Sequence, residues 1–280
     1  MTDTATFRPR RRLPTISTMM AIAMLSLAVA IAALTPLWSG YDPLRQDLFG
    51  SMAPAFEDMA HPFGTDALGR DVLSRLAKAT QVSILIASAA VAISACCGLF
   101  LGMIAGWYRG WADTLLMGLG NVQLAIPVVL LLIVLVAALG ASTWLLVLLL
   151  GLTNWVNYGR LTRSMVLGLR EQEFVIAAQT AGASDSWILT RHLLPNVAPK
   201  VLILAAFDTG VVIAIESSLS FIGLGIQPPT PSLGMMISEG QRYLQTDPHL
   251  TILPAFVIFC LIGGIQFAGQ GLAAAKPSRN

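Results

Sequence analysis

The chain has 280 residues, of which 55% are hydrophobic and only 11% are charged. An ordinary soluble domain carries about 25% charged residues, so this chain has too few charges to cover a water-exposed surface. Its 17 basic and 15 acidic residues give a net charge of +2, which by itself points to no partner. The composition therefore indicates an integral membrane protein.

Six apolar stretches follow one another along the chain, and a helix that crosses a bilayer needs about 20 such residues. The stretches cover 16–38, 82–107, 114–139, 143–158, 201–224 and 251–268. Lipid offers the backbone no hydrogen bonds, so each span must be helical or shielded by protein. The sequence therefore predicts an all-α membrane protein with six transmembrane helices.

The first stretch follows arginines at positions 8, 10, 11 and 12, an order of features that signal peptides share. The apolar core of a signal peptide usually has about 7–15 residues, and this stretch is longer. We therefore expect it to remain in the protein as a membrane anchor.

The distribution of Lys and Arg predicts the orientation. With a cytoplasmic N-terminus, twelve basic residues fall in cytoplasmic segments and five in outer segments. The positive-inside rule requires such an excess, so both termini are predicted to be cytoplasmic. The two long connections are then an outer loop at 39–81 and an inner loop at 159–200. We divide the chain into 1–81, with the N-terminal tail, first transmembrane helix and outer loop, and 82–280, the core transmembrane domain with the inner loop.

Two features concern packing within the spans. Gly98, Gly102 and Gly106 recur every four residues on the second stretch, and such a ridge of small residues lets another helix approach closely. Pro127 lies inside the third stretch, where its missing N–H should kink the helix.

The inner loop has the pattern of two short amphipathic helices. Glu171 and Glu173 lie where the first helix would begin, and the helix dipole favours acids there. Gly182 is predicted to end this helix. Apolar side chains at i, i+3, i+4 and i+7 would form one stripe along it, namely Phe174, Ala177, Ala178 and Ala181.

A second short helix is predicted to follow. Ser184 or Asp185 can cap its N-terminus, and the helix would run through Leu193. Pro195 then marks a break before the next span. The stripe of the first helix needs a surface that buries it: the chain's own helix ends, lipid headgroups or a groove on another protein. The residues alone leave these alternatives open.

This inner segment resembles the EAA loop of ABC importer permeases, in which a Glu, two Ala, a Gly and a later Leu-Pro form the coupling helix. In particular it is similar to the dipeptide, oligopeptide and nickel permease family, in the second permease subunit type with a long first outer loop. The resemblance implies ATPase-coupling roles for Glu173, Ala177, Ala178, Gly182, Leu194 and Pro195. The chain departs from the motif at Ile176, where the family places a Glu, and the nearest acid upstream is Glu173.

Two further segments carry the same resemblance. Residues 61–75 read HPFGTDALGRDVLSR and are similar to the family's signature before the second span. Residues 220–229 read SFIGLGIQPP and are similar to the end of its fifth span. The family often ends in an acidic pattern that residues 269–277 lack, which leaves open whether this tail contacts an ATPase.

No phosphate-binding loop of the form G-x-x-x-x-G-K-[ST] occurs in the sequence, so the chain is not expected to bind ATP by that route. The resemblance implies a non-enzymatic permease subunit of a type I ABC importer in the inner membrane. Its partners would be a second permease subunit in a heterodimer, two ATP-binding subunits, an extracytoplasmic solute-binding protein and membrane lipid. The solute would be a di- or oligopeptide, or alternatively nickel or a metal chelate. No cofactor and no nucleic-acid partner is expected.

A rival from another class is a secondary transporter driven by an ion gradient. Such proteins commonly carry acids inside the membrane, and Asp208 and Glu216 lie in the fifth stretch without a basic partner in any span. Both are therefore candidates for lining a passage. The inner loop discriminates the two classes, because a secondary transporter has no ATPase to engage. His61, His192 and His249 are scattered over loops, so no catalytic site or metal site is expected.

Overall fold

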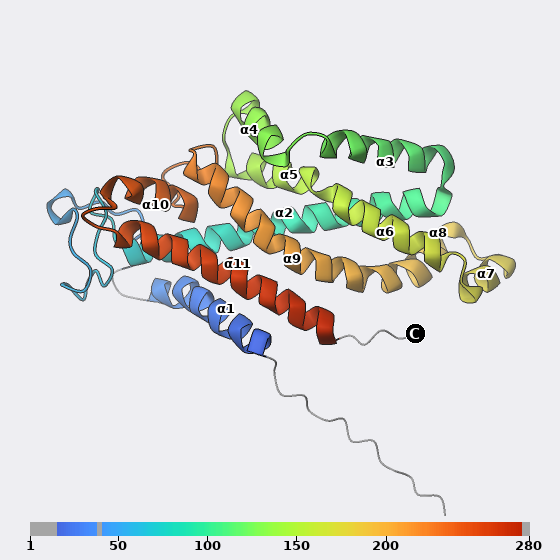
Figure 1. Ribbon diagram of the computed structural model, residues 1–280, viewed down its shortest axis with the longest axis horizontal. Helices are drawn as coiled ribbons and strands as arrows, with labels where there is room; N and C mark the ends of the chain where they lie inside the picture. The colour runs from blue at the N-terminus through green and yellow to red at the C-terminus, as the bar shows by residue number, and fades with distance from the viewer. Residues whose placement is uncertain (1–15, 38–40, 276–280) are drawn as a thin grey trace, which may run out of the picture.

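The computed structural model describes residues 16–37 and 41–275, which form a helical bundle elongated along one axis (Figure 1). Its longest helices are α1 (Ile16–Leu34), α2 (Val72–Tyr108), α9 (Leu194–Phe221) and α11 (His249–Ala275). The shorter ones are α3 (Gly110–Leu124), α4 (Val128–Leu139), α5 (Thr143–Thr153), α6 (Trp155–Leu169), α7 (Glu173–Thr180), α8 (Asp185–Ile188) and α10 (Leu233–Gly240). Single turns are η1 (Thr35–Leu37), η2 (Leu48–Gly50), η3 (Leu189–Leu193) and η4 (Gln241–Tyr243). The arginines predicted to precede the first span lie outside the described residues.

Four helical segments are long and apolar enough to cross a membrane, namely Thr18–Leu37, Val72–Tyr108, Asp185–Phe221 and His249–Gly271. A fifth span results if α3 and α4, which meet at 86°, are counted as one broken span. Within the described residues, an isolated bridge between Thr65 and Asp71 is the one piece of strand-like pairing. The described chain is therefore an all-helical membrane protein with four to five candidate spans.

The predicted kink at Pro127 is a full break between two helices. α3 ends at Leu124, α4 begins at Val128, and Pro127 is the residue that precedes α4. The proline nitrogen cannot donate to the carbonyl four residues earlier, so the hydrogen-bond ladder of α3 is not continued. The kink expected within 114–139 is therefore present as a break, at which the chain turns by 86°.

The predicted break at Pro195 is absent. One helical segment runs without interruption from Asp185 to Phe221. Its residues Leu189–Leu193 form a π-helical turn that ends two residues before the proline. A wider turn leaves room for the pyrrolidine ring, which in a regular α-helix would clash with a preceding carbonyl. Pro195 therefore lies in the first turn of α9 and does not separate two helices.

Helix α2 begins ten residues before the predicted second span. Asp71 caps it, accepting a hydrogen bond from the Ser74 N–H at 2.7 Å. The first turns of α2 carry Arg75 and Lys78, whose charges set the limit of the apolar stretch. Those charges limit how far lipid can cover the helix, whereas the capping residue sets where the helix starts.

The glycine ridge of α2 packs directly on α6, as predicted. A Cβ at Gly102 would lie 2.5 Å from the Gly159 carbonyl oxygen and 2.7 Å from Thr162 Cβ. A Cβ at Gly106 would lie 2.8 Å from Val166 Cβ. The two backbones therefore approach so closely that no side chain larger than hydrogen fits between them.

Buried apolar side chains form two clusters. The larger one joins α2, α5, α9 and α11, and its fully buried members include Leu76, Leu146, Ile213 and Leu261. The smaller one joins the C-terminal end of α2, α6 and the N-terminal part of α9 to the segment between α6 and α9, through Trp107, Tyr158, Val166, Val175, Ile188, Leu193, Val197 and Val201. The inner loop is therefore part of a packed core.

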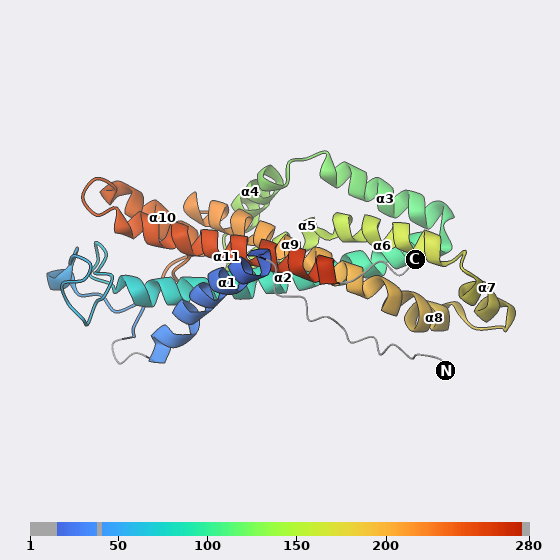
Figure 2. The ribbon, with the colours of Figure 1, turned by 60° about the horizontal axis from the view of Figure 1, so that its bottom comes forward.

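The two ends of the bundle carry the two long connections. In Figure 1 the segment 41–71 and α10 lie at one end, and α7 and α8 lie at the other. Figure 2 shows α3 and α4 on the side of the bundle opposite α1, with α5 and α6 between them and the other helices. Helix α2 runs from one end to the other.

Adding one methyl group to the glycine ridge should destabilise the protein. In Gly102→Ala the new Cβ meets the backbone of α6, so the two helices have to separate. Overpacking of this kind typically costs about 1–3 kcal/mol. Gly118→Ala is the matched control, because its Cβ meets nothing within 4 Å. The thermal unfolding midpoint of the solubilised protein should fall in G102A and hold or rise in G118A, and equal midpoints would contradict the packing described here.

Candidate functional site

The inner loop predicted at 159–200 is shorter in the structure, because α6 runs to Leu169 and α9 begins at Leu194. The segment between these helices, called the inner loop from here on, carries α7, α8 and η3. Three of its apolar side chains, Val175, Ile188 and Leu193, are fully buried in the smaller cluster. There they pack with Trp107 of α2 and Val197 of α9. The loop is therefore fixed to the C-terminal end of α2 and the N-terminal part of α9.

The turn between α7 and α8 follows the predicted pattern. Gly182 has a φ of +82°, a left-handed conformation that glycine adopts without strain, and its N–H donates to the Gln179 carbonyl at 2.9 Å. The Ser184 hydroxyl caps α8 by accepting from the Trp187 N–H at 3.4 Å. The predicted helix end and cap are confirmed. The prediction that the second helix stops at Leu193 is wrong, because the helix continues into α9.

The predicted apolar stripe of α7 is not buried by the rest of the described chain. Phe174, Ala177 and Ala181 are exposed, and Ala178 is half-buried. The residue that anchors α7 is Val175, on a different face of the helix. Phe174, Ala177 and Ala181 therefore face outward, whereas Ala178, three residues after Val175, packs against the smaller cluster.

Next to this stripe lies an aromatic cluster that the sequence pattern did not reveal. The Trp187 and His192 rings meet edge to face with centroids 4.8 Å apart, and the Phe174 ring lies 5.8 Å from His192. Trp187, Phe174 and Ile176 are each about half exposed, at 48%, 42% and 50%. The π-helical turn, whose hydrogen bonds join residues five apart, brings Trp187 and His192 onto one side. In the sequence, the signal that could have indicated this cluster was Trp187, a large aromatic residue between Ser186 and Ile188.

The other residues of the motif lie at the two ends of the loop. Glu173 is in the exposed first turn of α7, where the helix dipole favours a carboxylate. Leu194 is half-buried and Pro195 exposed in the first turn of α9. These residues and the α7 stripe therefore share one loop at one end of the bundle (Figure 1).

Two arginines tie the base of the loop to neighbouring helices. Arg170 donates to the Trp107 carbonyl oxygen at 2.9 Å, and its guanidinium lies 5.7 Å from the centre of the same tryptophan's ring. Arg163 of α6 forms a two-pronged ion pair with Asp113 of α3, with one N–O distance of 2.6 Å. A displacement of the loop base therefore acts on α2, α3 and α6 together.

Asp208 lies beside the interruption between α5 and α6. Asn154 separates these helices, and its side-chain amide donates to Asp208 Oδ2 at 3.2 Å. Asn157, which is exposed, donates to Asn154 Oδ1 at 3.4 Å. The buried Tyr158 hydroxyl is a further polar neighbour of the Asp208 carboxylate. Asp208 is therefore a half-buried acid in a polar cluster.

Glu216 is fully buried where α2 and α9 cross. Ser83 of α2 donates to Oε2 at 3.0 Å, Ser220 donates to Oε1 at 2.8 Å, and the Ser217 hydroxyl lies 3.4 Å from Oε2. These three hydroxyls compensate for the burial of the carboxyl group. Asp208 and Glu216 therefore have separate neighbours, and the structure does not bring them together. Within the described residues no cluster of His, Cys, Asp and Glu side chains could hold a metal ion.

The sequence is similar to a family of transport proteins. Residues 98–273 match the family described as binding-protein-dependent transport system inner membrane component. The dipeptide transport system permease protein of Alkalihalophilus pseudofirmus is 36% identical over 215 residues, covering 77% of this chain and 71% of that protein. The oligopeptide transport system permease protein of Bacillus subtilis is 32% identical over 257 residues, covering 92% and 84%. The glutathione transport system permease protein of Escherichia coli is 36% identical over 217 residues, covering 78% and 72%.

Proposed function

The chain belongs to the family of binding-protein-dependent transport system inner membrane components, and from this premise we propose that it moves di- or oligopeptides across the membrane. It is a permease subunit of an ABC importer, a multi-pass inner-membrane component that catalyses no reaction itself. Membership of such an importer implies that this chain works together with ATPase subunits and a binding protein. Family membership excludes the rival class of transporters driven by an ion gradient.

The observation that carries the proposed solute is the similarity to three permeases named for peptides. They are named for dipeptides, oligopeptides and glutathione, at 32–36% identity. Glutathione is itself a tripeptide, so all three names share the chemistry of a short chain with amide, amine and carboxylate groups. Nickel or a metal chelate, the alternative from the sequence, lacks this support from the same three relatives.

Uptake into membrane vesicles tests the solute. Vesicles with the assembled importer and its binding protein should accumulate a labelled dipeptide or oligopeptide when ATP is present inside. The same vesicles should accumulate no labelled nickel, and vesicles without this chain should accumulate neither. Accumulation of nickel in place of peptide would overturn the proposed solute while leaving the permease assignment intact.

We infer a six-span topology with both termini in the cytoplasm. Asn154 alone separates α5 from α6, so these two helices count as one span, and α3 with α4 counts as another. Together with α1, α2, α9 and α11 they alternate through the membrane, with 41–71 and α10 outside and α7 and α8 inside. In this arrangement 1–81 carries the outer loop and 82–280 is the core permease domain.

We propose that α7 and the aromatic cluster dock on an ATP-binding subunit. The complete importer would hold two permease subunits as a heterodimer above two ATP-binding subunits, and the binding protein would deliver the solute. Closure of the ATP-binding subunits would push on α7, and the buried Val175 and Ile188 would pass this movement to α2 and α9. The residues proposed for coupling are Glu173, Ala177, Ala178, Gly182, Leu194 and Pro195.

Replacing Gly182 with valine should uncouple transport from ATP hydrolysis. A valine side chain disfavours the left-handed conformation by about 1–2 kcal/mol, so the angle between α7 and α8 should change. Gly168→Val in α6 is the matched control, because both positions have free space for a side chain and Gly168 has an ordinary helical backbone. Peptide uptake per ATP hydrolysed should fall in G182V and hold in G168V. Full uptake by an assembled G182V complex would remove Gly182 from the coupling mechanism.

We further propose that Asp208 lines the passage in the assembled importer. Its half-buried carboxylate at the α5–α6 break has polar neighbours and can attract the amine of a peptide. Glu216 has no exposed atom in this chain, so its part in the passage requires a movement of α2 against α9.

Asp208→Asn tests this role, because it removes the charge and keeps the shape. Uptake of a peptide with a free amine should fall several-fold, and uptake of its N-acetylated form should change little, since that form carries no cation to attract. Glu216→Gln is the comparison variant and should leave both rates unchanged if the complex assembles. Equal loss for both peptides in D208N would contradict the proposed attraction.

A further inference from the structure

The outer segment 41–71 is a folded unit. Its two halves are joined by hydrogen bonds from the Thr65 N–H to the Ala53 carbonyl at 3.2 Å and from the Phe56 N–H to the Pro62 carbonyl at 3.1 Å. The Thr65 hydroxyl donates to the Gly50 carbonyl at 2.5 Å. The segment therefore holds a defined shape.

Four charged side chains fix this segment to the bundle. Arg70 binds Asp66 at 2.7 Å and Glu239 of α10 at 3.2 Å. Arg75 of α2 binds Glu239 at 2.9 Å and also pairs with Asp66. The Arg75 side chain is only 4% exposed, so water screens these pairs weakly. A movement of α2 or α10 would therefore carry the outer segment with it.

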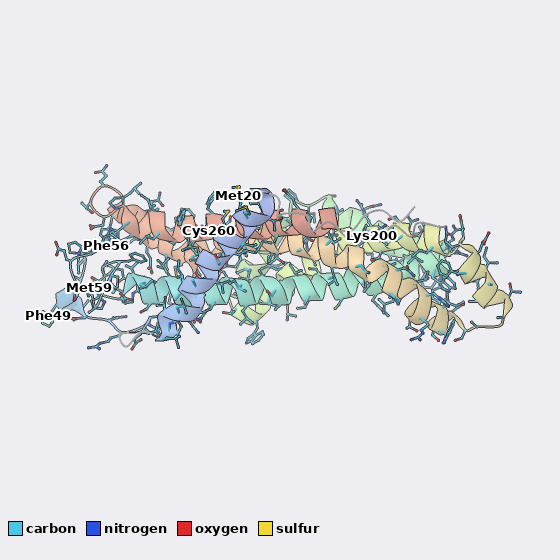
Figure 3. The ribbon with its side chains drawn as sticks, turned by 90° about the horizontal axis from the view of Figure 1, so that it is seen from below. Met20, Phe49, Phe56, Met59, Lys200 and Cys260 are labelled. Carbon is cyan, nitrogen blue, oxygen red and sulfur yellow. The ribbon has the colours of Figure 1, made fainter. Side chains whose placement is uncertain are left out.

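The far end of this segment presents bulky apolar side chains to solvent. We call these four residues the outer tip: Leu48, Phe49, Phe56 and Met59. Phe49 is fully exposed, and Phe56 and Met59 are exposed to 81% and 79%. Asp47 accepts from the Phe49 N–H at 3.1 Å and so holds the turn that carries Phe49. Figure 3 shows Phe49, Phe56 and Met59 at the end of the molecule, beyond the start of α2.

Lipid and the neighbouring permease subunit do not account for the outer tip. The charged Arg75 and Lys78 in the first turns of α2 lie between the apolar part of that helix and the tip, so the tip is outside the bilayer. In the proposed heterodimer, a second permease subunit would pack along the sides of the spans, whereas the tip lies at the end of the long axis (Figure 3). Exposed phenylalanine and methionine at such a place are typical of a protein interface.

The charges around the outer tip are mainly acidic. Four exposed carboxylates lie within six residues of it in the chain, and Arg45 is a basic residue in the same stretch; the acids are Asp42, Asp47, Glu57 and Asp58. An apolar centre with an acidic rim is complementary to an apolar patch with basic neighbours.

We propose that the outer tip is the docking surface for the extracytoplasmic solute-binding protein, whose matching face carries an apolar patch flanked by lysine or arginine. This inference rests on the proposed function for the need of such a partner. The ion network between Asp66, Arg70, Arg75 and Glu239 then connects the docked protein to α2 and α10.

The affinity of the purified binding protein for the importer in lipid nanodiscs tests this proposal. The triple variant Phe49→Ser, Phe56→Ser, Met59→Ser should weaken binding at least tenfold and lower uptake at limiting binding protein. Excess binding protein should restore the uptake. ATPase activity without binding protein should be unchanged.

A second variant covers the outcome in which the triple variant does not fold. Glu57→Lys changes one exposed rim charge that makes no hydrogen bond or ion pair within the described residues, so the fold should hold. It should weaken binding several-fold at low salt and less at high salt. Unchanged affinity in both variants would overturn the proposal, as would loss of the second permease subunit from the triple variant. If the wild-type importer binds the binding protein but takes up no peptide, this result would instead contradict the proposed solute.

Discussion

The close approach of α2 and α6 is the contact on which the rest of the structure depends. At Gly102 and Gly106 the two helices meet with no room for a side chain, so neither can slide along the other without losing that contact. With 37 residues, α2 is about 55 Å long and reaches from the outer segment to the inner loop. At its outer end Arg75 forms the ion pairs with Asp66 and Glu239. At its inner end Trp107 accepts a hydrogen bond from Arg170 and packs with the buried residues of the inner loop. One rigid pair of helices therefore joins the two places where partner proteins are proposed to bind.

Two interruptions divide the bundle, and the one at Asn154 directly precedes this contact, because a Cβ at Gly98 would lie 2.5 Å from the Trp155 carbonyl oxygen. Asn154 divides α5 from α6, and Pro127 precedes the 86° turn between α3 and α4. A helix break frees backbone groups from the hydrogen-bond ladder and so absorbs a change in direction at lower cost than a packed backbone contact. In the proposed importer, α2 and α6 would therefore move as one body, and the segment around Pro127 would take up the difference.

The sequence predicted the elements whose cause is local, and it did not predict those whose cause is tertiary. The helix end at Gly182 and the cap at Ser184 depend on backbone conformation within a few residues, and the glycine ridge needs only its own spacing. The continuity of α8 into α9 depends on a π-helical turn that propensity does not reveal, so the break expected at Pro195 was wrong. The outward direction of the α7 stripe is a consequence of Val175 entering the inner cluster, a contact made with residues far away in the chain.

The two acids of α9 show why residue type and spacing leave function open. Eight residues apart on one helix, they have the same chemistry, yet hydroxyls of Ser83 and Ser220 enclose Glu216 while Asp208 lies half-buried at the α5–α6 break. Glu216 therefore ties α9 to α2, the fixed part of the bundle, and Asp208 ties it to Asn154, the interrupted part. Because α9 also continues from the inner loop, a push on α7 reaches both contacts through one helix. The difference between the two acids is thus set by what each meets across the bundle, and it places the polar, half-open site at the interruption between α5 and α6.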